Sequence, residues 1–416
     1  MRVLFLLHAH PDLQAGGTEI FARDLFRTLR NQGVEGLFLA GTAAHQRPPS
    51  PGTPFQSVSG APDEVLLWSG GFDPFFLSQI DVHGVAEPLG RLLAELQPDV
   101  IHIHHFLTLG VELMSLLRRF APRARIVMTL HDYYAQCAND GQMVTTSGTL
   151  CHAARPDACR KCFPDRGLTD FKLRDLHIGA ALAQVDQFIS PSQFLRDRYI
   201  AWGLSGERIT VLPNGFPSVP SAPLRRSMRR DRFAFFGHIN RFKGATVALG
   251  ASAQLTRAGV THALSVHGST EHQAETTVTR FEQALAAAPD SRYRGPYRRT
   301  EIPALMTGAD WVIFPSEWWE NAPLVINEAF QHRRPVICSA LGGALELVHD
   351  GVNGLHFPVG DASALAEVMR RAIEEPGLWQ DLVGRAEAPV SIEESAARHL
   401  ALYNDLLCSP APRRVA

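Results

Sequence analysis

The stretch that decides the fold runs from Trp311 to Phe330 and reads WVIFPSEWWENAPLVINEAF. Its first four residues are apolar and end at Pro315, which predicts a short buried strand of a parallel sheet. Asn321 is a candidate N-cap, and Pro323 suits the first turn of a helix, where a missing N–H costs nothing. The order strand, loop, helix predicts a helix that begins at the carboxyl edge of an open α/β sheet.

The first turn of that helix is a candidate anion site. We expect the N–H groups of Leu324 and Val325 to bind an anion, most simply a phosphate. Glu320 precedes the helix and Glu328 lies inside it, and carboxylates accept hydrogen bonds from hydroxyl groups. This layout favours a ligand with phosphate at its centre and hydroxyl-bearing rings at both ends, as in a sugar nucleotide. The alternative interpretation is a solvated helix face with one acid in the preceding loop.

The two acids stand in a recognisable pattern. Glu320, seven residues and Glu328, with Glu320 closing Pro-Ser-x-x-x-Glu, resemble the signature of the family 4 retaining glycosyltransferases. The resemblance runs from Val3 to Leu407 through five motifs in the family's order. It implies an α/β protein of the GT-B architecture, with two Rossmann-like doubly wound domains facing across a cleft. The expected parts are an acceptor-side domain over 1–214, a nucleotide-sugar domain over 215–390, and a helix and tail over 391–416 that return to the first domain.

Length and composition agree with a two-domain α/β protein. The chain has 416 residues, of which 45 % are hydrophobic and 20 % charged, and its formal net charge is −2. A chain of this length suits two cores, and the charge gives no basic field for nucleic acid. The apolar run after Met1 stops at His8, and no run reaches the ~18 residues needed to span a bilayer, so we expect a first strand and a cytoplasmic protein. The sequence does not indicate an oligomeric state.

Two features of the first domain are candidate parts of the ligand site. Gly16 and Gly17 separate the first strand from the first helix, where glycine lets the backbone approach a ligand closely. His131 directly follows the strand 125–130, at the edge where polar residues line the crevice of an open sheet. The resemblance implies that the glycine pair faces the distal phosphate and the acceptor, and that His131 reaches the donor sugar. A histidine that only caps a loop is the alternative, and we interpret His102 and His104 as a buried, hydrogen-bonded pair.

A cysteine cluster follows His131 in a stretch that reads as a loop with few apolar residues. Cys159 and Cys162 have the two-residue spacing of zinc knuckles, whereas the spacing of Cys137 and Cys151 is not standard. A tetrahedral Zn²⁺ held by these four thiols would substitute for the core that such a segment lacks. Unbound thiols and a disulfide remain as alternatives.

The second domain repeats the strand-then-loop pattern. Phe233–Gly237 reads as a buried strand, and the loop after it carries Arg241 and Lys243, which suit the clamping of a diphosphate. The resemblance implies that Gly237 and this loop contact the donor. The family's commoner form has arginine at the position of His238, so the sequence leaves open whether Arg241 supplies the second charge.

The implied activity is transfer of a sugar from a nucleoside-diphosphate sugar to a hydroxyl of a glycan or lipid-linked glycan, with retained anomeric configuration. No cofactor is expected for catalysis, and the departing phosphate is expected to take the acceptor's proton. Alternatives are a sugar-nucleotide epimerase or a phosphorylase of the same fold, or a non-catalytic nucleotide-sugar binder. The three-glycine fingerprint of a dinucleotide dehydrogenase is absent. The basic run 225–232 is either a solvated turn or a peripheral contact with anionic lipid headgroups.

Overall fold

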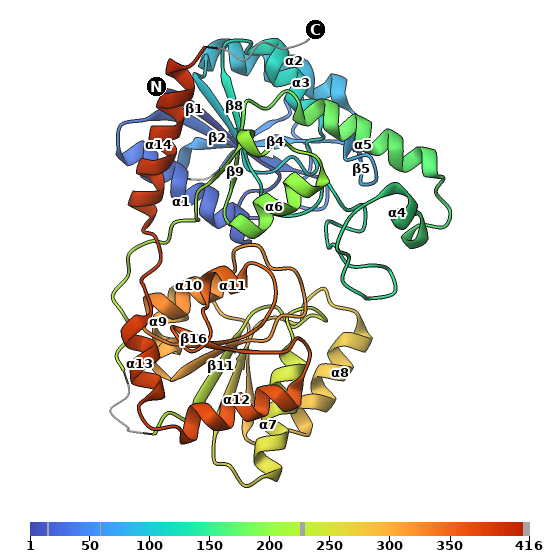
Figure 1. The fold of residues 1–416 in the computed structure, drawn as a ribbon. Coiled ribbons are helices and arrows are strands. Elements are labelled where there is room, and N and C mark those ends of the chain that lie inside the picture. Colours follow the sequence, from blue (N-terminus) through green and yellow to red (C-terminus); the bar gives the residue numbers. More distant parts are fainter. Residues whose placement is uncertain (15, 59, 225–228, 411–416) are drawn as a thin grey trace. The chain divides into compact units, whose positions relative to one another are not determined.

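The fold was analysed in a computed structural model, which describes residues 1–14, 16–58, 60–224 and 229–410. The chain forms two compact units (Figure 1). The first consists of Met1–Pro217 and Val390–Ala416, and the second of Ser218–Pro389. The first boundary lies three residues after the one expected from the sequence, and the second boundary lies one residue before the expected one. Residues 225–228 of the expected basic run lie outside the described residues.

The first unit is built on an eight-stranded sheet with the order β10-β9-β8-β7-β1-β2-β4-β3. Neighbouring strands pair in parallel except β3 with β4. Strand β1 pairs with β2 on one side and with β7 on the other, so the strand order reverses there, where open sheets bind ligands. The strands are β1 (Arg2–Leu7), β2 (Glu35–Thr42), β3 (Phe55–Val58), β4 (Ala61–Trp68), β7 (Val100–Ile103), β8 (Arg125–Thr129), β9 (Gln187–Ser190) and β10 (Ile209–Val211), with β5 (Phe72–Asp73) and β6 (Ser78–Gln79) forming a separate ribbon.

The last helix of the chain belongs to the first unit. Helix α14 buries Ile392, Ala396 and Tyr403 in the same hydrophobic cluster as Phe21 of α1. Figure 1 shows α14 running beside α1 and the strands of the sheet. The helices of this unit are α1 (Gly17–Asn31), α2 (Val82–Leu96), α3 (Glu112–Phe120), α4 (Pro156–Cys162), α5 (Leu168–Leu182), α6 (Gln193–Trp202) and α14 (Ile392–Cys408), with the short 3-10 helix η1 (Gly206–Arg208).

The second unit has a six-stranded, all-parallel sheet with the order β13-β12-β11-β14-β15-β16. Its strand order reverses between β11 and β14. The strands are β11 (Arg232–Phe236), β12 (Ala263–His267), β13 (Ser291–Gly295), β14 (Trp311–Phe314), β15 (Val336–Ser339) and β16 (Gly354–Phe357). The helices are α7 (Ala245–Arg257), α8 (Glu275–Ala286), α9 (Ile302–Thr307), α10 (Leu324–Gln331), α11 (Ala344–Leu347), α12 (Ala362–Glu374) and α13 (Leu378–Arg385), with the 3-10 helix η2 (Arg299–Glu301).

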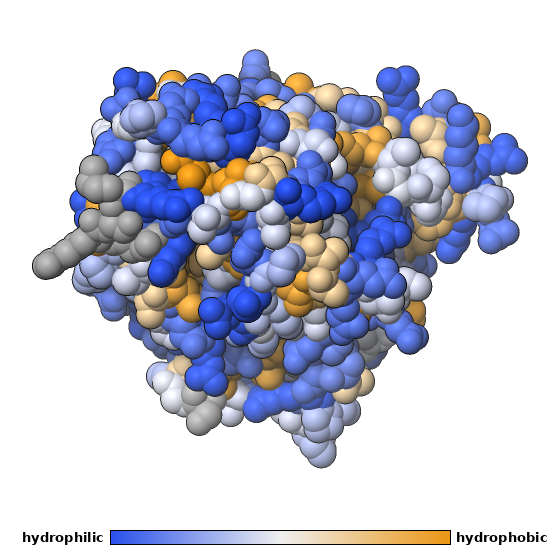
Figure 2. Space-filling model, turned by 90° about the horizontal axis from the view of Figure 1, so that it is seen from below, coloured by the Kyte–Doolittle hydropathy of each residue, from blue (hydrophilic) through white to orange (hydrophobic). Residues whose placement is uncertain are grey.

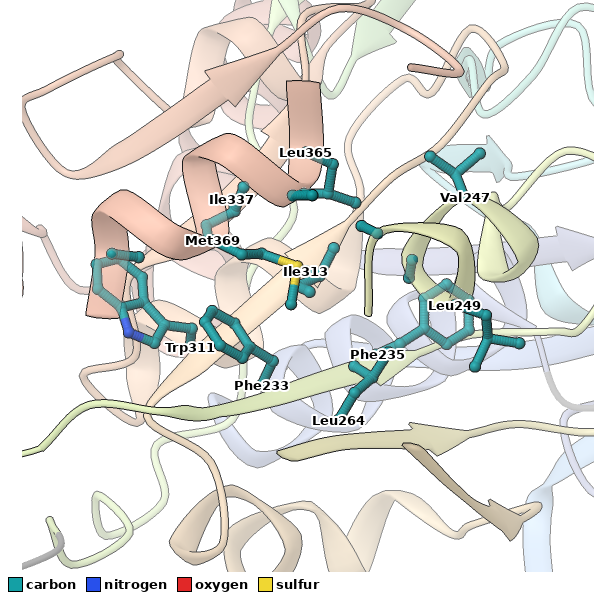
Figure 3. Close-up of a cluster of buried hydrophobic side chains, with 14 of the residues drawn as sticks. Phe233, Phe235, Val247, Leu249, Leu264, Trp311, Ile313, Ile337, Leu365 and Met369 are labelled. Carbon is teal, nitrogen blue, oxygen red and sulfur yellow. The ribbon is translucent and has the colours of Figure 1, made fainter. Parts of the chain in front are cut away.

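Alternating strand residues supply the core of the second unit. Phe233 of β11 and Trp311 of β14 lie near Met369 of α12, and Phe235 of β11 belongs to the same cluster (Figure 3). All four side chains are at most 1 % exposed. Burying a side chain of this size contributes about 1.5–3 kcal/mol, so the cluster holds the sheet rigid beneath the loops at its carboxyl edge.

Three parts of the secondary structure differ from the expectations. The proline, glycine and serine content of residues 42–80 predicts irregular structure, yet they contain β4, which pairs in parallel with β2. The helix α4 lies in the cysteine-bearing stretch that reads as a loop. Helix α10 starts at Leu324 with Pro323 as N-cap, so Asn321 is not the N-cap. Pro323 itself has an extended backbone, with ψ 117°, so it precedes the first turn instead of lying in it.

Among the described residues, no helix is long and apolar enough to cross a membrane. On the face seen in Figure 2, hydrophobic residues appear as small patches between hydrophilic ones. Scattered apolar residues of this kind are ordinary on protein surfaces.

Candidate active site

Three loops of the second unit meet at the carboxyl edge of its sheet. They follow β11, β14 and β15 and span residues 237–244, 315–323 and 340–343. The N–H of Glu317 donates to the carbonyl of Phe242 at 2.7 Å, and the N–H of Gly343 donates to the carbonyl of Glu320 at 2.7 Å. These backbone bonds fix the three loops against one another beside the point where the strand order reverses.

The first of these loops requires a glycine at its end. Gly244 has φ +71°, and a Cβ there would collide with the carbonyl oxygen of Pro315. The side chain of Asn240 shapes the same loop, since its Oδ1 accepts the N–H groups of Phe242 at 2.9 Å and Lys243 at 3.0 Å. An asparagine turn of this type aims the following side chain, here Lys243, toward the neighbouring loop.

Lys243 and Glu320 form an ion pair across the two loops. Nζ of Lys243 lies 2.6 Å from Oε1 of Glu320, and the two side chains are 26 % and 9 % exposed. Oγ of Ser316 lies 3.0 Å from the same carboxylate oxygen, and the Lys243 ammonium is 5.7 Å from the ring centroid of Trp318. The structure therefore brings together two of the residues that the sequence predicts for the site, although they are 77 positions apart.

Glu328 is buried near the start of α10. Its residue is 9 % exposed, and burial raises the pKa of the carboxyl despite the opposing charge of Arg299. Burial and the nearby Glu328 also raise the pKa of Tyr297. The N–H groups in the first turn of a helix have no acceptor within that helix. Those of Leu324 and Val325 are therefore suited to bind an anion.

The remaining predicted residues of this unit occupy distinct places. Arg241 is exposed, lies over the ring of Phe242 at 4.9 Å, and lowers the pKa of Glu317 against the larger, raising effect of burial. The positive charge of Arg241 thus favours the ionised form of the Glu317 carboxyl. Gly237 has φ +150°, and its N–H donates to the carbonyl of His267 at 3.1 Å. His238 is exposed.

In the first unit, the predicted residues lie at the carboxyl edge of the sheet. Gly16 is the N-cap of α1, and Gly17 begins that helix and is exposed. His131 follows β8, and its Nε2 lies 3.2 Å from Nδ1 of His104. Burial lowers the pKa of His131 to about 3, so its imidazole is neutral at physiological pH.

Comparisons with known proteins identify the family. The family model described as Glycosyltransferase Family 4 matches residues 15–218, and the model described as Glycosyl transferases group 1 matches residues 230–375. The chain is a family 4 glycosyltransferase. Relatives of its full length support the assignment. D-inositol 3-phosphate glycosyltransferase 1 of Catenulispora acidiphila is 25 % identical over 418 residues, covering 94 % of this chain and 91 % of the relative.

Solved structures show that this glycosyltransferase has the GT-B fold with two Rossmann-like domains. The Anabaena protein HepE, solved with UDP and glucose, aligns with a TM-score of 0.67 at 17 % identity, covering 97 % of this chain and all of HepE. Sucrose-phosphate synthase of Thermosynechococcus elongatus aligns with a TM-score of 0.70 at 18 % identity, covering 99 % and 100 %. The family and these relatives support an enzyme that uses nucleotide-sugar donors.

The cysteine cluster of this glycosyltransferase does not have the arrangement expected of a zinc site. None of the four cysteines is in a disulfide. Burial raises the pKa of Cys159 to about 11, and the neighbouring Cys137, Cys151 and Cys162 also act to raise it. Among the described residues, however, no three or more His, Cys, Asp or Glu side chains are placed to hold a metal ion. The thiols as they stand do not fit the metal, so no step of the chemistry is assigned to zinc.

Sequence reasoning missed a group of polar side chains next to His131. His8 pairs with Glu19 at 2.9 Å, and His105 pairs with Asp132 at 2.6 Å. The signal was present for three of them, because His8, His105 and Asp132 follow β1, β7 and β8, as His131 does, whereas Glu19 lies in the first turn of α1. His102 and His104 are buried as expected but do not bond to each other: Nδ1 of His102 lies 2.6 Å from the hydroxyl of Tyr403, and Nε2 lies 2.7 Å from that of Thr129.

Proposed function

We propose that this enzyme moves a sugar from a nucleoside-diphosphate sugar to a hydroxyl of a glycan or lipid-linked glycan in the cytoplasm, with the anomeric configuration retained. The observation that carries the proposal is the ion pair of Lys243 with Glu320, at the carboxyl edge of a sheet and in the loop that leads into α10. A cation and helix amides at one place suit a departing diphosphate, and a carboxylate suits sugar hydroxyls.

In this proposal Lys243 and the N–H groups of Leu324 and Val325 neutralise charge that develops on the diphosphate. Charge stabilisation by fixed groups is usually the largest single contribution to catalysis. The donor's phosphates would compete with Glu320 for Lys243, because the ammonium is already paired at 2.6 Å. Displacement of that pair frees the carboxylate for the sugar, so donor binding itself assembles the site.

Other residues recognise the two ends of the donor. Glu328, buried and held in α10, accepts hydrogen bonds from the ribose hydroxyls, and Asn321 and Gly237 border the nucleotide. Glu320 with His131 holds the sugar, and the neutral imidazole of His131 serves as a hydrogen-bonding group. Gly16 and Gly17 face the distal phosphate and the acceptor. Arg241 supplies a second positive charge near the loop that carries Lys243.

The proposal is tested first by donor binding. A panel of UDP-, GDP- and ADP-sugars is added to the enzyme in a thermal-shift measurement, because a bound donor stabilises the folded state by mass action. We expect one nucleotide to raise Tm by several degrees, and the rise to disappear in Lys243→Ala. Lys172→Ala is the matched control, since Lys172 is exposed on α5 and far in sequence from the proposed site. No shift with any donor contradicts the proposal.

Two alternatives remain, a sugar-nucleotide epimerase and a non-catalytic nucleotide-sugar binder. One incubation of the same preparation distinguishes both from a transferase. Incubated with its donor and no acceptor, a transferase slowly releases the nucleoside diphosphate and free sugar. An epimerase instead changes the sugar while it stays attached, and a binder leaves the donor intact. Chromatography of the nucleotide products distinguishes the three outcomes.

A further inference from the structure

Two carboxylate–imidazole pairs stand side by side at the carboxyl edge of the first unit's sheet. Nε2 of His8 lies 2.9 Å from Oε1 of Glu19, and Nε2 of His105 lies 2.6 Å from Oδ2 of Asp132. The centroids of the two imidazole rings are 4.4 Å apart. Glu19, His8, His105 and Asp132 therefore form one continuous row of side chains, which we call the histidine ladder. Its members come from the ends of β1, β7 and β8 and from the first turn of α1.

Hydrogen bonds define the protonation of the ladder. The N–H of Leu107 donates to Nδ1 of His105 at 2.9 Å, which leaves the ring proton on Nε2, where it is donated to Asp132. Burial opposes the ionisation of Glu19 and Asp132, but the partner imidazoles outweigh it and lower the pKa of both carboxyls. Burial lowers the pKa of His8. Burial also opposes a charge on His105, but the adjacent Asp132 carboxylate outweighs it and raises the pKa of His105. The ladder thus consists of two carboxylates, a neutral His8 and a His105 whose protonated form Asp132 stabilises.

The ends of the ladder touch the two loops that the proposed function places around the sugar. At one end, Glu19 packs beneath the glycine loop, so closely that a Cβ on Gly16 would lie 2.5 Å from its Oε2. At the other end, Asp132 is the neighbour of His131 in the chain, and its Oδ1 accepts the N–H of Tyr134 at 2.9 Å. A shift of either loop must therefore disturb the side chains that hold the other.

We propose that the histidine ladder is a positioning device that couples the Gly16–Gly17 loop to the His131 loop. The inference rests on the proposed function for the role of those loops in sugar transfer. The ladder residues act through the loops, and none of them is assigned a contact with the reacting atoms. Their contribution is to hold His131 and the glycine-loop backbone at a fixed separation, which matters because small misplacements of substrate-positioning groups are costly to catalysis.

A third pair in the same unit provides a matched control. Nε2 of His10 lies 2.8 Å from Oε2 of Glu64, the N–H of Asp12 donates to Nδ1 of His10 at 3.2 Å, and Arg27 also pairs with Glu64. The His10–Glu64 pair is more deeply buried than the ladder pairs, with side-chain exposures of 1 % and 4 %, against 12 % and 4 % for His8–Glu19 and 6 % and 25 % for His105–Asp132. Its carboxylate stands on β4, and the two residues that hydrogen-bond to it, His10 and Arg27, lie outside the His131 loop. Loss of either kind of pair should therefore have a similar cost in stability but a different effect on transfer.

The experiment is a double-mutant cycle with Glu19→Gln and Asp132→Asn, with Glu64→Gln as control. We expect each ladder variant to lower kcat roughly 10–30-fold, and the double variant to fall no more than about threefold below the worse single variant, because both break one device. Glu64→Gln should lower Tm by a similar amount and leave kcat within about twofold of the parent. Independent, multiplying effects of the two ladder variants overturn the proposal, as does an equal loss of kcat in Glu64→Gln.

A second measurement does not depend on activity. Hydrogen exchange of the backbone amides in the first turn of α1 should speed up in Asp132→Asn, although Asp132 lies more than 100 positions away in the chain, and should stay unchanged in Glu64→Gln. Unchanged exchange in both variants contradicts the coupling. If the wild-type enzyme transfers no sugar while the exchange rates respond as expected, the proposed function fails and the coupling stands, so the two failures can be told apart.

Discussion

The two units share a Rossmann-like fold, yet the residues at their carboxyl edges differ in chemistry. In the second unit the edge carries Lys243, which is partly exposed and paired with Glu320 in the loop that leads into α10. In the first unit it carries the histidine ladder, which is buried and holds two carboxylates with lowered pKa values. One edge suits an anion, and the other suits neutral hydroxyls and developing positive charge. The shared fold therefore determines where a site lies, whereas the local side chains determine which end of a ligand binds at that site.

Removal of the cation at the second edge is expected to have the largest effect. Lys243→Ala should lower turnover more than 10²-fold, about 3 kcal/mol of transition-state stabilisation, because no other lysine lies in these loops. Steady-state rates with saturating donor measure the change, and circular dichroism confirms that the fold is intact. If the turnover of Lys243→Ala were close to that of the Lys172→Ala control, the proposed difference in chemistry between the two edges would be wrong.

A glycine substitution tests how tightly the loops of the second edge are joined. Gly244→Ala places a methyl group against the carbonyl of Pro315 at a positive φ, so one of the two loops must move. We expect a loss of about 1–3 kcal/mol in the free energy of unfolding and a rise in KM for the donor. Denaturant titration and initial rates measure the two effects. An unchanged unfolding midpoint would show that the loops are more adaptable than the backbone contacts indicate.

The buried acid of α10 gives a prediction that depends on pH. Burial raises the pKa of Glu328, so the wild-type protein loses stability as pH rises through the unfolded value of about 4.3 and the higher folded value. Glu328→Gln should therefore be the more stable protein above the folded pKa, with the difference vanishing below about pH 4. Donor affinity should fall about 10-fold, because an amide accepts ribose hydrogen bonds less strongly. Thermal unfolding across pH, with and without the donor, separates the two effects.

The smallest effect is expected at the first edge. Gly16→Ala brings a methyl group against a carboxylate of Glu19, which is the end of a flexible side chain, and Gly16 has an ordinary extended backbone. We expect less than about 1 kcal/mol of destabilisation and a few-fold loss of turnover through the displaced ladder. The two glycine variants together compare a methyl group that meets a movable side chain, at Gly16, with one that meets a backbone carbonyl, at Gly244. A larger loss at Gly16 than at Gly244 would reverse the ranking of the two loops.

Much of the fold could be predicted because several strands are short apolar runs followed by glycine, proline or histidine. Phe233–Gly237 and the stretch from Trp311 to Pro315 are of this kind. Strand β4 was missed because Ala61–Trp68 begins with proline and two acids, and one of these acids, Glu64, is buried only because it pairs with His10 and Arg27. The helix α2 contains Pro88, which weakens its pattern.

Individual residues of the candidate site could be predicted where a polar side chain follows a strand in the sequence. Lys243 and Glu320 were each expected from a loop after a strand, but their contact depends on which strands are neighbours, and the order β11-β14 is set by the tertiary fold. The same limit hid the histidine ladder, whose pairs join residues 11 and 27 positions apart. The thiols of the cysteine cluster have a suggestive spacing, yet their arrangement does not form a metal site among the described residues.

The bond between Tyr403 and His102 joins residues 301 positions apart in the chain. Because α14 completes the hydrophobic cluster beneath the central sheet, a polypeptide ending at residue 217 would expose that apolar surface and leave the His102 ring without its phenol partner. The amino-terminal half should therefore aggregate when produced alone. Joining residues 390–410 to it through a short linker, or supplying them as a separate peptide, should restore a soluble product. Ribosomal synthesis of this enzyme must then pass α14 before the first unit can reach its native form.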